Sequence, residues 1–214
     1  MNILAFTSKF PIFFTVVILT ILLIHNIRKS DRLTQKKQAD YFERESKANS
    51  TRRKSLETVD YIVIPYDSLP MNLETDDEII ADCIKQLNEL KDQPIANFTG
   101  LTNTDLKLEY GAPNIGHLTR CDNDFTILVR ILQDWAKRLH ELGHDEEAIY
   151  ILEFAIKNRS DVSASYYLAA KIYFSNKDEK KIAWLKRCAE TLNSMMSTPI
   201  LRTLNEKYPD ISAY

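Results

Sequence analysis

The fold of this chain is decided by two consecutive stretches of equal length: VRILQDWAKRLHELGHDEEAIYILEFAIKNRSDV, residues 129–162, and SASYYLAAKIYFSNKDEKKIAWLKRCAETLNSMM, residues 163–196. Apolar positions recur at a spacing of 34 residues, from Ala148 to Ile182 and from Ala155 to Ala189. A period of this length indicates a repeated helix-turn-helix unit. Gly143 is expected to end the first helix, and the acidic residues after it favour the start of the next. The chain is therefore predicted to contain two stacked helical hairpins.

The two stretches resemble tetratricopeptide repeats, which share this period. Small side chains let helices approach closely, and larger ones fill the space between them. Such residues stand where the helices of the family touch: Ala136, Leu139, Gly143, Ala148, Leu152 and Ala155 in the first unit, and Ala170, Tyr173, Ile182 and Ala189 in the second. Three positions depart from the family pattern: Ser160 replaces a proline, Lys177 the turn glycine and Lys186 an apolar residue.

The resemblance also implies a binding groove lined by the first helix of each unit. Its candidate residues are Arg130, Gln133 and Lys137 from the first unit and Tyr167 and Lys171 from the second. Three of these five are basic, so the expected ligand is an acidic peptide or a C-terminal carboxylate. The alternative is that all five are merely exposed helix residues.

Two further helices are expected to complete the stack, because about three repeats are usually needed for stability. One spans Thr75–Lys91 and begins with a capping box at Thr75-Asp76-Asp77-Glu78. Its apolar stripe comprises Ile80, Cys83, Ile84 and Leu87. The other is a capping helix over Ile200–Lys207.

Two short extended segments are predicted between the N-terminal region and the repeats. Asp60–Pro65 is rich in β-branched residues and ends at a proline, which favours a strand. Leu106, Leu108 and Tyr110 alternate with charged residues, which indicates a second strand that is buried on one side.

The N-terminus carries an uncharged apolar run, Phe10–Ile24. Leu4–Phe6 can lengthen it upstream and His25–Ile27 downstream, so residues 1–27 are predicted to form a transmembrane anchor. A cleaved signal peptide is the alternative, but no small-residue cleavage site follows the run. Lysine and arginine are concentrated after it, which places the C-terminal domain in the cytoplasm of a single-pass membrane protein.

Residues 28–59 form a basic juxtamembrane stalk within a chain whose formal net charge is only −2. The stalk either attracts anionic lipid headgroups or only reflects the concentration of lysine and arginine on the cytoplasmic side of a transmembrane helix. No nucleic-acid partner is expected, because aromatic residues do not alternate with the basic ones. The layout also resembles single-pass membrane proteins of Gram-positive bacteria, to which no activity is attached, through Phe42-Glu43-Arg44-Glu45 and Asn103–Gly111.

One motif points to an enzyme instead. His140-Glu141-Leu142-Gly143-His144 matches H-E-x-x-H, in which two histidines on one helical face bind zinc and the glutamate is the general base. A membrane zinc metallopeptidase is therefore an alternative function. Against it, Gly143 indicates a helix end, which would remove His144 from that face.

Taken together, the sequence predicts a mainly α fold: a transmembrane helix, then a tetratricopeptide-like hairpin stack with a short extended insertion. Residues 60–122 are expected to pack on the repeat domain, residues 123–214. The predicted function is a membrane-tethered protein-protein interaction module, not an enzyme, with no cofactor. A structural subunit of a membrane complex is a further alternative.

Overall fold

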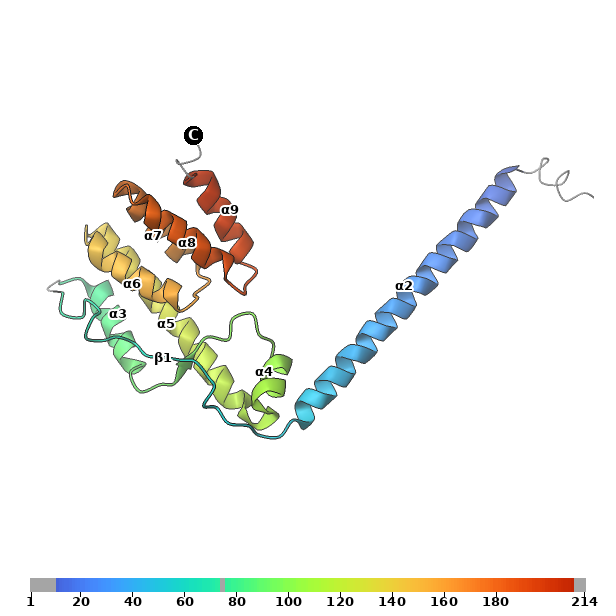
Figure 1. Cartoon of the computed structure of the whole chain (residues 1–214), viewed down its shortest axis with the longest axis horizontal. Coiled ribbons are helices and arrows are strands. Elements are labelled where there is room, and N and C mark those ends of the chain that lie inside the picture. The colour runs from blue at the N-terminus through green and yellow to red at the C-terminus, as the bar shows by residue number, and fades with distance from the viewer. Residues whose placement is uncertain (1–10, 74–75, 210–214) are drawn as a thin grey trace, which may run out of the picture. The chain divides into compact units, whose positions relative to one another are not determined.

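The computed structural model describes residues 11–73 and 76–209, and it is mainly helical (Figure 1). Its chain divides into two compact units, Met1–Thr51 and Arg52–Tyr214. In the first unit, α2 runs from Pro11 to Ser50 without a proline or glycine inside it. Proline is tolerated at the first position of a helix, which is where Pro11 stands.

The predicted transmembrane helix lies partly outside the described residues, since Leu4–Phe6 precede them. Within the ranges that the structure describes, no helix combines the length and the apolar character needed to cross a membrane. The helix found at this place is α2, which carries the apolar run from Pro11 onward and most of the predicted stalk in one continuous element.

The second unit contains the predicted hairpins. Helix α5 spans Ile115–Glu141, α6 Asp145–Lys157, α7 Ser163–Ser175, α8 Glu179–Glu190 and α9 Ser197–Lys207. Consecutive helices pack on each other from α5 to α9 (Figure 1). Helices α6 and α8 begin 34 positions apart, at 145 and 179, so the period found in the sequence is the period of the structure. The capping helix expected at Ile200–Lys207 is present as α9.

The residues predicted to lie between the hairpin helices form the core. Trp135 belongs to this core and is fully buried. All of the predicted contact residues except the turn glycine are buried: Ala136, Leu139, Ala148, Leu152, Ala155, Ala170, Tyr173, Ile182 and Ala189. Burial of this apolar surface is the main favourable term in folding the unit.

In three turns of the hairpin stack, one residue has a left-handed backbone conformation with a positive φ. Gly143 has a φ of 86°, Arg159 of 59° and Lys177 of 56°. In each turn the next backbone N–H donates to a carbonyl five residues earlier, as from Asp178 to Tyr173. Lys177 therefore adopts a backbone conformation that glycine takes without strain, at a cost of roughly 1 kcal/mol for a residue with a side chain.

Helix α3 spans Glu78–Glu89 and packs on α5, as the apolar stripe predicted. Its N-cap is Asp77, whose carboxylate accepts hydrogen bonds from the N–H groups of Ile79 and Ile80. The predicted capping box began at Thr75, which is outside the described residues.

The predicted strand at Asp60–Pro65 is present but short. It is β1, Tyr61–Ile62, and it pairs antiparallel with β2, Ile95–Ala96. The second predicted strand is wrong: Asn103–Tyr110 forms helix α4. The Thr102 hydroxyl and the Asp105 carboxylate cap its start reciprocally, and Leu106 and Tyr110 are buried one turn apart. A short 3₁₀ helix, Ala112–Asn114, links α4 to α5.

Candidate functional site

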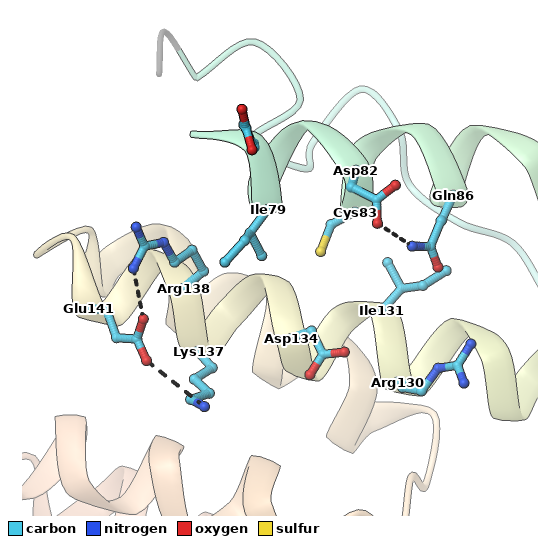
Figure 2. A pocket seen from close by; sticks show the side chains of 11 residues that line it. Ile79, Asp82, Cys83, Gln86, Arg130, Ile131, Asp134, Lys137, Arg138 and Glu141 are labelled. Atoms are coloured by element: carbon cyan, nitrogen blue, oxygen red, sulfur yellow. Dashed lines mark hydrogen bonds and ion pairs between the residues drawn. The ribbon is translucent and has the colours of Figure 1, made fainter. Parts of the chain in front are cut away.

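A groove of about 520 Å³ lies between α3 and α5 in the second unit (Figure 2). It is called here the α3–α5 groove. Apolar side chains lie between the two helices: Ile79 and Cys83 point from α3 toward α5, and Ile131 points back from α5, with Cys83 and Ile131 forming the floor. Cys83 and Ile131 are buried, whereas Ile79 is 51% exposed. An exposed isoleucine above a buried floor offers an apolar contact to an incoming side chain.

Charged side chains form the rims of the α3–α5 groove. They are Glu78 and Asp82 from α3 and Arg130, Asp134, Lys137, Arg138 and Glu141 from α5. No aromatic residue lines the groove within the described part of the chain. Small-molecule pockets are lined mainly by apolar and aromatic residues, whereas most of the residues that line this groove are charged.

An ion-pair network closes one end of the groove. The Arg138 guanidinium donates to Asp77 through Nε and Nη2, at 2.9 and 2.7 Å, and to Glu141 through Nη1 at 3.0 Å. The hydrogen bond from Arg138 lowers the pKa of Asp77. Because Asp77 also caps α3, this network fixes the start of α3 against the last turns of α5. Lys137 lies 3.9 Å from the same Glu141.

The floor thiol is unsuited to nucleophilic chemistry. Burial raises the pKa of Cys83 to about 11, and the nearby carboxylates of Asp134, Asp82 and Asp77 add to the effect. A cysteine acts as a nucleophile or metal ligand through its thiolate, and at neutral pH this thiol stays protonated. Cys83 therefore contributes to the groove as a small apolar side chain.

Two of the five predicted groove residues, Arg130 and Lys137, line the α3–α5 groove. Gln133 accepts a hydrogen bond from the Ser165 hydroxyl at 2.6 Å, which joins α5 to α7.

The two candidates from the second repeat also have partners within the fold. The Tyr167 hydroxyl donates to Thr203 on α9 at 3.2 Å. Lys171 Nζ lies 3.0 Å from His140 Nε2. The α3 wall of the groove, with Glu78 and Asp82, was not among the predicted residues. The apolar stripe that predicted α3 could have indicated these two residues. Polar residues beside such a stripe border the contact with the next helix.

The H-E-x-x-H residues do not share one helix. Helix α5 ends at Glu141, Gly143 has a positive φ, and His144 is the N-cap of α6. His140 Nδ1 donates to the Asp145 carboxylate at 2.5 Å, so its Nε2 accepts from Lys171. Both ring nitrogens of His140 are thus hydrogen-bonded within the fold. In the described ranges, no three His, Cys, Asp or Glu side chains lie close enough to hold a metal ion.

No protein family, curated protein or solved structure gives a significant match to this chain.

Proposed function

We propose that this chain is a protein-interaction module that docks a segment of a partner protein in the α3–α5 groove. The observation that carries the proposal is the half-exposed Ile79, which stands over a buried apolar floor between two charged rims. Interfaces of this kind use an apolar centre for affinity and a polar rim for specificity. The resemblance of the hairpins to tetratricopeptide repeats supports the same class of function.

Site-specific photocrosslinking in the full-length chain tests this proposal. A photoreactive amino acid at position 79 is expected to crosslink one partner protein in native membranes. The matched control is position 63, where Val63 is 82% exposed but does not line the groove. Equal crosslinking from both positions, or none from position 79, would contradict docking in the groove.

We further propose that α2 tethers the module to a membrane. Apolar side chains are exposed all around the early part of this helix: Val16, Val17, Ile18, Leu19, Ile21, Leu22, Leu23, Ile24 and Ile27. A helix that is apolar on every side needs a nonpolar surrounding. The basic residues that follow it support the cytoplasmic placement of the C-terminal unit.

Membrane attachment is tested by extraction with alkaline carbonate. The full-length chain should stay with the membrane pellet, and the double variant Ile18→Asp/Leu22→Asp should be released. Retention of this variant would refute the tether. Protease added to intact cells should spare the second unit, and digestion there would refute the cytoplasmic placement.

A further inference from the structure

The charges that remain without an ion pair in the α3–α5 groove are predominantly negative. Glu78, Asp82 and Asp134 have no ion pair among the described residues, and the Asp82 carboxylate accepts only a neutral amide N–H, from Gln86 at 2.6 Å. Among the described residues that line the groove, Arg130 is the one cation without an ion pair. The other lining cations are held in the network at the end of the groove. A docked segment therefore meets an excess of carboxylate.

The carboxylates are spaced to match one face of a helix. Glu78 and Asp82 stand four residues apart on α3, so their Cβ atoms are about 6 Å apart. Asp134 faces the groove from α5 on the other side of the apolar floor (Figure 2). Side chains at positions i and i+4 of a partner helix have the same spacing.

We infer that the occupant of the α3–α5 groove is a basic amphipathic helix of a partner protein. It places an apolar side chain on Ile79 and presents lysine or arginine at i and i+4 to Glu78 and Asp82. This inference rests on the proposed docking in the groove and names its partner class. It differs from the acidic ligand expected from the sequence, because that expectation counted Lys171, which is engaged with His140 outside the groove, and did not include the carboxylates that line it, Glu78, Asp82 and Asp134.

Two fluorescent amphipathic peptides of equal length serve as probes. Both carry leucine at i, i+3, i+4 and i+7, and they differ only in having lysine or glutamate at the flanking positions. Binding to the full-length chain in an uncharged detergent is followed by fluorescence anisotropy. The lysine peptide is expected to bind at least about tenfold more tightly than the glutamate peptide, with an advantage that shrinks as salt is added.

Two charge-matched variants separate the groove from the overall charge. Asp82→Lys/Asp134→Lys should weaken binding of the lysine peptide about tenfold. Glu190→Lys/Glu206→Lys makes the same change in net charge at exposed positions of α8 and α9 and should leave binding unchanged. Equal weakening by both pairs would overturn the inference.

A third variant distinguishes failure of the inference from failure of the proposed function. Ile79→Asp removes the apolar contact and should abolish binding of either peptide. If the glutamate peptide binds as well as the lysine peptide and Ile79→Asp abolishes both, docking survives and the basic partner class is refuted. If neither peptide binds, or if Ile79→Asp has no effect on binding, the basic helix is refuted as an occupant of this groove.

Discussion

Glu153 joins three helices of the hairpin stack, and its replacement by glutamine tests how that stack is held together. Its carboxylate on α6 accepts hydrogen bonds from Lys157 at 2.9 Å, from the Tyr173 hydroxyl on α7 at 2.7 Å, and from Lys181 on α8. Burial by itself would raise the pKa of Glu153, but the hydrogen bonds from Lys181, Lys157 and Tyr173 outweigh it and lower the pKa from 4.5 to about 2.

The magnitude of the loss follows from this shift. At about 1.4 kcal/mol per pKa unit, the shift corresponds to roughly 3 kcal/mol of stabilisation of the charged form. Both lysines are partly exposed, with 62% and 41% of their side chains accessible, so solvent screening reduces the contribution. Glu153→Gln is therefore expected to lower the free energy of unfolding by ~2 kcal/mol at neutral pH.

Urea unfolding of the full-length chain measures this loss, because Trp135 and Trp184 both lie in the hairpin helices and report on their packing by fluorescence. The control is Glu190→Gln, at an exposed position of α8, with an expected change near zero. A Glu153→Gln variant as stable as this control would refute the reasoning.

The pH dependence gives a second check on Glu153. Since the folded pKa lies below the ordinary value, the stabilisation is fully present above pH 4.5 and is lost as the pH falls toward 2. The wild-type chain should therefore lose more stability over this range than the Glu153→Gln variant.

Three other substitutions give independent predictions. Lys177→Gly should raise the free energy of unfolding by about 1 kcal/mol, because glycine adopts the positive φ of this turn without strain, whereas Asn176→Gly next to it should give no gain. Tyr166→Phe should be neutral or stabilising by up to about 1 kcal/mol in urea unfolding, since the buried hydroxyl has no hydrogen-bond partner among the described residues, and a clear loss would contradict this. Asp77→Ala should lower the free energy of unfolding more than a surface substitution such as Glu190→Gln, because it removes both the α3 cap and the partner of Arg138, and an equal loss would contradict the role assigned to this network.

The hairpins could be predicted because their signal is local and repeated. The spacing of small and apolar residues directly determines which helix faces can meet, and Ala148 and Ala155 are fully or almost fully buried where the period placed them. Helix α4 was missed because alternation at 106, 108 and 110 also suits a helix that buries Leu106 and Tyr110 at i and i+4. The cap formed by Thr102 and Asp105 is the signal that would have decided between the two.

The groove could be predicted only in part, because its charges are paired between distant parts of the chain. Arg138 and Asp77 are 61 residues apart, and no periodicity connects them. Whether a basic side chain is available to a ligand or occupied within the fold depends on such pairs. Arg138 is occupied by partners within the fold, whereas Arg130 has no ion pair among the described residues and is available to a ligand. Both residues lie on α5.

The length of α5 has a consequence for how the second unit unfolds. Its early residues Leu118 and Cys121 belong to a small core with Val59, Phe98 and neighbouring residues, and its later residues belong to the large core around Trp135. One uninterrupted helix thus serves both cores. In an array of repeats each unit contacts only its neighbours, so single units can open separately. Here the region around α5 should open as one cooperative block, so hydrogen exchange should protect its two halves together, while the amides of α8 and α9 exchange earlier.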